Sequence, residues 1–136
     1  MRLIDKPVVE HIVFSDLDAG LNVHPLTREI KPKTNREAIK RSLIHLMNWE
    51  PWDVPFQPEL KSNIRELLFD IPNWTTTVVI SDNIKWLVNT FEKRIDLVDV
   101  IVTPTHSEDG VDITIKYIVV STGEPDSLNY NITRVR

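Results

Sequence analysis

Two carboxylates in a proline-rich segment have the residue types for acid–base chemistry. Glu50 and Asp53 flank Pro51 and Trp52. An aromatic ring beside a carboxyl group can raise its pKa by excluding water, and glycosidases place two such groups about 5–10 Å apart across a cleft. An acidic chain offers many carboxylate pairs, so the residues favour a simpler interpretation, in which Trp49 and Trp52 anchor a solvated loop.

A second charged group stands where a predicted helix ends, at Glu92, Lys93 and Arg94. Lysine and arginine near a helix C-terminus interact favourably with the helix dipole, so a solvated helix end is the simplest interpretation. The alternative is a docking site, because an arginine side chain can donate two parallel hydrogen bonds to a carboxylate on a partner. Composition by itself favours the solvated helix end.

Other common chemistry has no motif in this sequence. The chain has no cysteine, which excludes disulfides, thiolate catalysis and cysteine-ligated metals. Its three glycines form no phosphate-binding loop, and its serines lie in no nucleophile-elbow context. The histidines are not spaced as metal-ligand pairs; they are His11, His24, His45 and His106. The sequence therefore predicts no catalytic, cofactor-binding or metal-binding residue and no cofactor.

Length and composition describe an ordinary globular protein. The 136 residues suit a single domain, residues 1–136, that buries a core without disulfides. Sixteen basic residues against twenty acidic ones give a net charge of −4. This balance argues against nucleic-acid and membrane partners, which need clustered positive charge. No segment reaches the ~20 apolar residues of a membrane span, and the start lacks a signal-peptide core, so we expect a cytoplasmic protein.

Three helices are predicted from the spacing of apolar residues. Residues 34–48 place apolar side chains on one helical face. Pro58 suits the first turn of a second helix, which Pro72 ends. A third helix is predicted for about residues 81–91. Residues 74–80 have strand propensity but continue the helical spacing, so the start of the third helix stays open.

The strands are predicted mainly in the last third of the chain. Residues 96–104 and the alternating run 111–119 are separated by Asp109-Gly110, a strong hairpin signal. Further alternation at residues 128–132 predicts a third strand or an extended tail within residues 121–136. Together these elements predict an α+β fold, in which about three helices pack on one face of a small, mainly antiparallel sheet.

The first third of the chain gives weaker signals. Residues 8–14 form a β-branched run that predicts a strand, and residues 15–20 have the composition of a turn. Residues 21–33 contain two prolines and predict a loop, with a short strand around residues 21–23 as an alternative.

The predicted last strand lacks the charged residues that usually protect a sheet edge. It can be an ordinary edge of the domain's own sheet, or it can accept a strand from another chain. The residues leave both interpretations open.

Four stretches, taken in order, resemble one known family. The chain has an aromatic-Ser-Asp-Leu-Asp opening, a first-helix signature, a P-F-x-P block and a motif similar to E-P-R-I before a hairpin. These stretches are Phe14-Ser15-Asp16-Leu17-Asp18, Ala38-Ile39-Lys40-Arg41-Ser42-Leu43, Pro55-Phe56-Gln57-Pro58-Glu59-Leu60 and Glu92-Lys93-Arg94-Ile95. Over about residues 12–120 their order resembles the gene-25-like baseplate wedge proteins of contractile-tailed phages, which have relatives in type VI secretion baseplates. Lys93 replaces the proline of the last motif.

The resemblance implies a non-enzymatic structural protein of the virion tail baseplate, assembled in the host cytoplasm. The implied partners are the tail sheath subunit and the baseplate wedge core proteins, with tail tube or hub proteins as further neighbours and six copies per baseplate. The chain would link the wedge core to the first sheath ring and initiate sheath assembly by strand addition.

The resemblance also implies roles for particular residues. Glu92, Lys93 and Arg94 would dock onto the wedge core, and we expect Arg94→Glu to abolish that binding while leaving the fold intact. The hairpin and the last strand would face the sheath. The residues in this second prediction are Val111, Ile113, Ile115, Tyr117, Val119, Leu128, Tyr130 and Ile132.

Two rival functions belong to the same resemblance. Lysozyme-like labels attach to the family, which makes a tail-associated peptidoglycan muramidase one alternative. Its candidate carboxylates are Glu50, Asp53, Glu59 and Glu66. A bacterial anti-adaptor has the same type of fold, so a regulatory binding module is the other alternative, because fold alone does not fix function.

Overall fold

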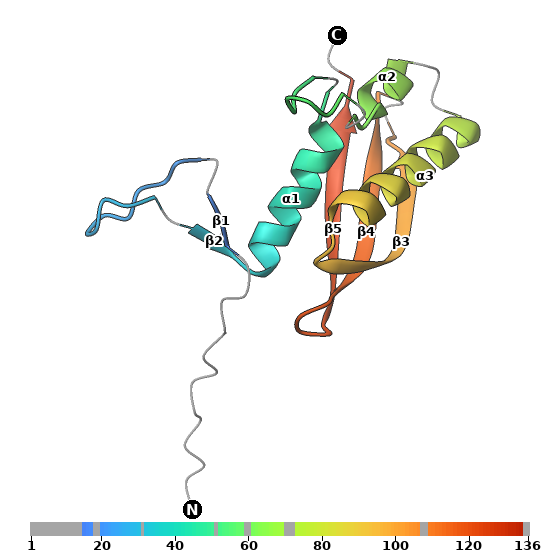
Figure 1. The fold of residues 1–136 in the computed structure, drawn as a ribbon. Helices are drawn as coiled ribbons and strands as arrows, with labels where there is room; N and C mark the ends of the chain where they lie inside the picture. The colour runs from blue at the N-terminus through green and yellow to red at the C-terminus, as the bar shows by residue number, and fades with distance from the viewer. Residues whose placement is uncertain are drawn as a thin grey trace, which may run out of the picture. The chain divides into compact units, whose positions relative to one another are not determined.

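The structure is a computed structural model that describes residues 15–17, 20–30, 32–50, 52–58, 61–69, 73–106 and 109–134. The chain divides into two compact units, Met1–Ile39 and Lys40–Arg136, whose elements are labelled in Figure 1. The interpretation of residues 1–136 as one domain stays a prediction.

The first unit contains a short antiparallel strand pair. Strand β1 (Ser15–Leu17) pairs with β2 (Pro32–Thr34), and an isolated bridge joins Val23 to Ile30. The turn predicted for residues 15–20 is therefore wrong at β1, because pairing with a distant strand overrides local turn composition. The strand predicted at residues 8–14 lies outside the described residues.

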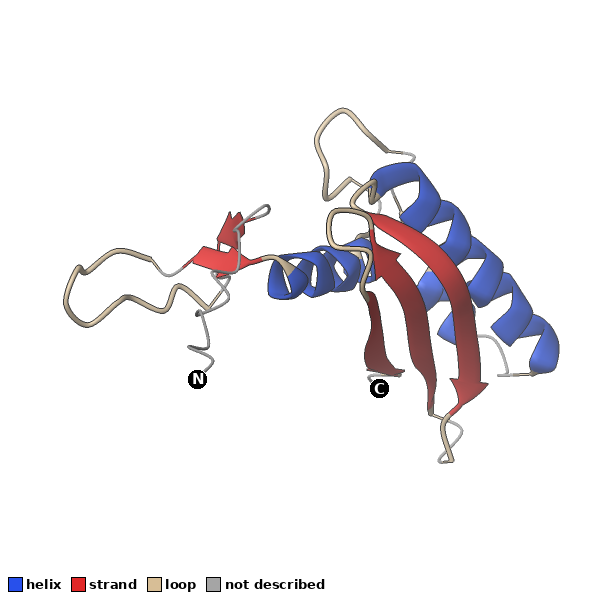
Figure 2. Ribbon diagram, turned by 90° about the horizontal axis from the view of Figure 1, so that it is seen from below, coloured by secondary structure: helices blue, strands red, loops and turns tan. Residues whose placement is uncertain are grey.

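The second unit is built on a three-stranded sheet. Strands β3 (Ile95–Pro104), β4 (Gly110–Val119) and β5 (Pro125–Thr133) lie in the order β3-β4-β5, and both pairings are antiparallel. Burial alternates along β4, so one face of the sheet is packed and the other is exposed. Figure 2 shows helices on one side of this sheet. The predicted α+β class is confirmed, and the C-terminal segment is a third strand rather than a tail.

Helix α1 (Arg36–Asn48) agrees with the prediction. Helix α3 (Trp74–Phe91) starts before the predicted range of about residues 81–91 and includes residues 74–80. Asn73 caps α3, because its Oδ1 accepts a hydrogen bond of 2.9 Å from the Thr76 N–H. The buried side chains of α3 keep helical spacing; they are Ile80, Ile84, Leu87 and Val88. The cap and this apolar face outweigh the strand propensity at the start of the helix.

Helix α2 (Ile64–Phe69) is much shorter than predicted. Asn63 has a φ of +52°, which is outside the helical range. The Ser62 N–H donates instead to the Trp49 carbonyl at 3.1 Å, which closes a loop between α1 and α2. The prediction that Pro58 starts this helix is therefore wrong, since tertiary hydrogen bonds hold the preceding residues in a loop.

The predicted β3–β4 hairpin is confirmed. Its glycine, Gly110, is needed because β4 and β5 approach closely there, and not for the conformation of a turn. The Thr105 N–H donates to the Gly110 carbonyl at 3.0 Å, and Gly110 already belongs to β4. A Cβ atom on Gly110 would clash with the backbone carbonyl of Ile132 on β5. Only glycine lets the two strands approach this closely.

Candidate functional site

Glu92 lies directly after α3 and is 4% exposed. Its N–H donates to the Val88 carbonyl at 2.9 Å. Its carboxylate accepts two hydrogen bonds from the guanidinium of Arg94, Nε to Oε1 at 2.7 Å and Nη2 to Oε2 at 2.8 Å. The hydroxyl of Ser42 on α1 is a further partner of the same carboxylate. The Glu92 carboxylate therefore joins the end of α3, the start of β3 and α1.

The surroundings of Glu92 favour its ionised form. Burial raises the pKa of Glu92, but the hydrogen bonds from Arg94 and Ser42 and the charge of Arg94 outweigh burial, so the net pKa lies below its ordinary value of 4.5. The two-point arginine contact that the sequence suggested for a partner's carboxylate is thus formed within the chain. The structure does not support the expectation that Arg94→Glu leaves the fold intact, because that change would set two carboxylates against each other in a buried site.

The three predicted docking residues differ in accessibility. Lys93 is exposed and donates from Nζ to the Asn89 carbonyl at 2.6 Å. The Arg94 side chain is 24% exposed, and its backbone carbonyl accepts from the Val120 N–H at 3.0 Å. A partner at this corner would meet Lys93 and the outer edge of Arg94, with Glu92 beneath them.

The side chains predicted to face the sheath belong to the packed face of the sheet. Seven are buried and Tyr130 is half-buried; the buried ones are Val111, Ile113, Ile115, Tyr117, Val119, Leu128 and Ile132. These side chains therefore form the chain's own core. If these strands pair with a strand of another protein, the main-chain groups at the sheet edges make the contact.

The edge along β3 is blocked at Val100 by its own chain. The Val100 N–H donates to the Asp99 carboxylate at 2.8 Å, and the Val100 carbonyl accepts from the Ser81 hydroxyl of α3 at 3.1 Å. The pairing of β3 with β4 also shifts register between Leu97 and Asp99, and Pro104 has no N–H to donate. A bulge and satisfied polar groups are common ways to prevent strand addition.

The edge along β5 is regular and presents backbone groups outward. The Arg134 N–H donates to the Asp109 carbonyl at 2.6 Å, and the Val119 N–H donates to the Glu124 carbonyl at 3.0 Å. These two hydrogen-bonded pairs have the same register as the β4–β5 ladder. In an antiparallel ladder, hydrogen-bonded pairs alternate with pairs whose N–H and C=O groups point away from the partner strand. The N–H groups of Asn129, Asn131 and Thr133 therefore point away from β4, toward the edge.

Side-chain contacts hold β5 in place from its packed face. Asp126 accepts from Lys40 Nζ on α1 at 3.2 Å and from the Tyr117 hydroxyl at 3.3 Å. Burial raises the pKa of Asp126, but the Ser127 N–H, the Lys40 ammonium and Tyr117 lower it further, so the net pKa is below its ordinary value of 3.8. Farther along, Asn48 Nδ2 donates to the Tyr130 hydroxyl at 2.8 Å. The open edge thus belongs to a firmly positioned strand.

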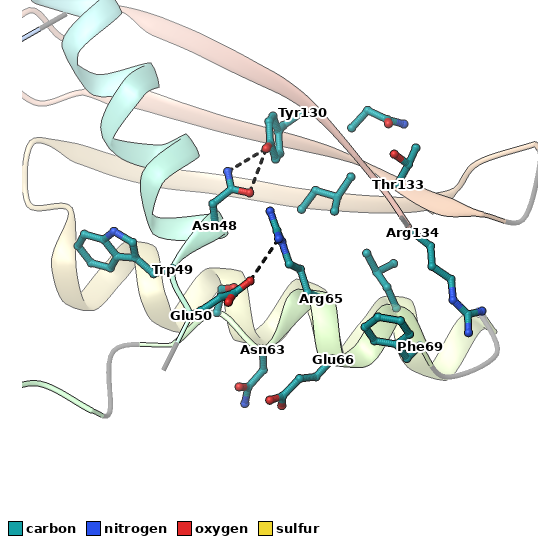
Figure 3. A pocket seen from close by; sticks show the side chains of 14 residues that line it. Asn48, Trp49, Glu50, Asn63, Arg65, Glu66, Phe69, Tyr130, Thr133 and Arg134 are labelled. Atoms are coloured by element: carbon teal, nitrogen blue, oxygen red, sulfur yellow. Dashed lines mark hydrogen bonds and ion pairs between the residues drawn. The ribbon is translucent and has the colours of Figure 1, made fainter. Parts of the chain in front are cut away.

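A cavity of about 570 Å³ lies between the end of α1, helix α2 and the end of β5, as Figure 3 shows. Arg65 Nη1 donates to Glu50 Oε1 at 3.2 Å, and the Arg134 guanidinium lies 5.2 Å from the Phe69 ring centre. These three charged groups contact each other or an aromatic ring within the chain, and Glu66 is the other charged residue of the lining, so the lining as a whole does not point to a particular ligand.

Three of the four muramidase carboxylates lack the environment that a general acid needs. Glu50, Asp53 and Glu66 are exposed, and the Trp52 side chain, at 76% exposure, shields no carboxyl group. Glu59 lies outside the described residues.

Neither a metal centre nor a membrane-spanning helix is found among the described residues. Within the described ranges, no three histidine or acidic side chains gather as metal ligands do. No helix in the same ranges has the length and hydropathy of a membrane span.

Sequence reasoning missed several residues of this region. Ser42 contacts Glu92, and Ser81 and Asp99 block the β3 edge. No local pattern marks them, because each acts through a contact with a residue on another element or through the bulge in its own strand.

The family model and the sequence search lead to one family. The family model described as "Baseplate wedge protein gp25" matches residues 33–124. The baseplate wedge protein gp25 of Enterobacteria phage T4 is 24% identical over 116 residues, which are 85% of this chain and 86% of that protein. A crystal structure titled as a putative tail lysozyme from Geobacter sulfurreducens has a TM-score of 0.65 and 26% identity, covering 74% of this chain and 91% of that one.

Proposed function

We propose that this chain, which belongs to the gp25 family of baseplate wedge proteins, links the wedge core of a contractile tail to the first sheath ring. In this proposal it templates sheath assembly by accepting a strand of the first sheath subunit. A structural role in a phage tail baseplate follows from the family itself. The link to the sheath and the strand addition are the proposal.

The open edge of β5 is the observation that carries this proposal. Asn129, Asn131 and Thr133 point their N–H groups outward along a strand that keeps regular register with β4. An added strand would gain main-chain hydrogen bonds there, and the exposed side chains beside them would set its register. The blocked edge of β3 leaves one side of the sheet for this addition, so a template of this kind would grow in one direction.

The opposite corner of the unit supports docking onto the wedge core. Lys93 is exposed, and the Glu92–Arg94 ion pair holds the backbone on both sides of it. In the proposal a partner carboxylate or carbonyl binds Lys93 and the outer edge of Arg94. Tail tube or hub proteins are further proposed neighbours, with six copies of the chain in each baseplate.

A reconstitution experiment tests the strand addition. Baseplates that lack this chain are supplied with the purified protein and sheath subunits, and sheath length is measured by electron microscopy. Asn129→Pro removes one outward N–H and no bond of the β4–β5 ladder. We expect this variant to remain folded and to join baseplates but to start at least tenfold fewer sheaths.

Asn129→Ala is the matched control, because it removes the side chain and keeps the N–H. It should start sheaths as the unchanged protein does. Normal sheath initiation by a folded Asn129→Pro protein would refute strand addition at β5, and absence of the chain from purified baseplates would refute the wider proposal.

A further inference from the structure

The loop between α1 and α2 contains two consecutive hydrogen-bonded turns of the same design. The Asp53 N–H donates to the Glu50 carbonyl at 3.2 Å, and the Gln57 N–H donates to the Val54 carbonyl at 3.3 Å. Each turn has proline second and an aromatic residue third in its sequence. The two turns are Glu50-Pro51-Trp52-Asp53 and Val54-Pro55-Phe56-Gln57.

The aromatic residue of each turn has an unfavourable backbone conformation. Trp52 has a φ of +75° and Phe56 a φ of +67°. A positive φ at the third position is the hallmark of a type II turn, where glycine is the usual residue because side chains with a Cβ are strained there. Trp52 is 76% exposed and Phe56 is fully exposed. The chain's own core therefore gains little from either ring.

The base of this loop is firmly attached. The Ser62 N–H donates to the Trp49 carbonyl at 3.1 Å, so the two ends of the loop meet. The Ser62 carbonyl accepts from Asn83 Nδ2 on α3, and Glu50 is paired with Arg65 on α2. In Figure 1 the loop, coloured green, lies beside α2 and the end of α1. Its two aromatic residues therefore sit on a positioned base rather than on a loose segment.

We propose that Trp52 and Phe56 form a paired aromatic anchor that inserts into an apolar cleft with a lysine- or arginine-rich rim on another protein. Exposed aromatic residues on a preorganised loop bind at low entropic cost and often dominate interface energy. Backbone strain at exposed residues is typical of binding sites, where the contact with the partner offsets it.

The charge of the loop indicates the chemistry of the partner. Residues 49–59 contain three acidic residues, Glu50, Asp53 and Glu59, and no lysine or arginine. Glu50 is paired with Arg65 of α2, which leaves Asp53 and Glu59 as the acidic residues that carry this argument. A basic rim around the cleft complements this charge. The same charge is repelled by nucleic acid and by anionic lipid, which disfavours both as partners of the loop.

Site-specific photo-crosslinking tests this inference in cells that assemble the particle. A benzophenone amino acid replaces Trp52 or Phe56, and the exposed Thr75 at the start of α3, far along the helix from Lys93, is the control position. We expect both loop positions to cross-link to one protein, at a cleft lined by apolar residues and rimmed by lysine or arginine, with at least tenfold less adduct at Thr75. Adducts on lipid or nucleic acid, adducts on a flat or acidic surface, or no adduct from either loop position would overturn the inference.

Glycine substitutions separate docking from a role in the fold. Trp52→Gly and Phe56→Gly keep the positive φ that the turns require, so the melting temperature should stay constant or rise by up to about 4 °C. With the photo-crosslinker at one loop position, glycine at the other should reduce the adduct at least fivefold. A fall in melting temperature of more than about 5 °C would show that the rings support the fold, which contradicts the inference.

This experiment is independent of the sheath proposal. Cross-links are read in whole cells before particles are purified, so they form whether or not β5 accepts a sheath strand. A protein with the β5 edge disabled by Asn129→Pro should retain its loop cross-links.

Discussion

The guanidinium of Arg94 binds both carboxylate oxygens of Glu92, two residues earlier in the chain, at 2.7 and 2.8 Å. The Glu92 side chain is 4% exposed and the Arg94 side chain 24%. This pair fixes the passage from α3 to β3 and presents Lys93 between its members. The same arginine therefore has a role in the fold and a proposed role in docking, and experiments must separate the two.

Removing the arginine should destabilise the protein strongly. Arg94→Ala leaves a buried carboxylate without its main partner, and we expect the free energy of unfolding to fall by about 2–4 kcal/mol. Urea denaturation followed by circular dichroism measures the change. Lys93→Ala is the matched control, because its side chain is exposed, and it should change stability by less than about 0.5 kcal/mol. Equal effects of the two substitutions would contradict the structural role of the pair.

Stability should decrease in acid. The folded-state pKa values of Glu92 and Asp126 lie below their ordinary values of 4.5 and 3.8. A lowered carboxyl pKa contributes stability that is fully present above the ordinary pKa and is lost as the pH falls through the folded pKa. We expect constant unfolding free energies from neutral pH down to about pH 5 and a decline below that. Urea titrations between pH 3 and pH 7 measure the unfolding free energy. The Glu92→Gln protein should show a shallower decline in acid than the unchanged protein. Identical pH profiles of the two proteins would exclude Glu92 as a contributor.

Gly110 should tolerate no side chain. A Cβ atom there meets the Ile132 backbone, so Gly110→Ala must push β4 and β5 apart, and we expect a loss of about 2–3 kcal/mol in thermal or urea unfolding. Gly123 provides the comparison, because its φ is +68° with open space around it. Gly123→Ala should cost about 1 kcal/mol through backbone strain alone. The prediction fails if Gly110→Ala is the milder of the two.

The protein should not hydrolyse peptidoglycan. Glu50 and Asp53 are exposed, and Glu50 contacts Arg65 at 3.2 Å, so this pair lacks the water-excluding pocket of a glycosidase acid. A turbidity assay on purified peptidoglycan should show no clearing by the unchanged protein or by Glu50→Gln. Clearing that Glu50→Gln abolishes would establish the muramidase alternative.

Local sequence patterns determined much of the fold. The helical spacing of apolar residues located α1, and strict alternation located β4 and β5, because each pattern matches the period of an element with one buried face. The order of short motifs also pointed to the family that the comparisons show. Composition excluded cysteine chemistry without any structure.

Only the tertiary structure decided the features on which the proposed function depends. Residues 74–80 became helix through the Asn73 cap, and residues 61–63 stayed in a loop held by Trp49 and Asn83. The sequence could not show which sheet edge is open, because Ser81 blocks β3 from another element. It also could not show that Arg94 binds Glu92 within the chain. Hydrogen bonds and burial between distant segments form only when the chain packs, whereas the periodicity of apolar residues is a property of the sequence itself.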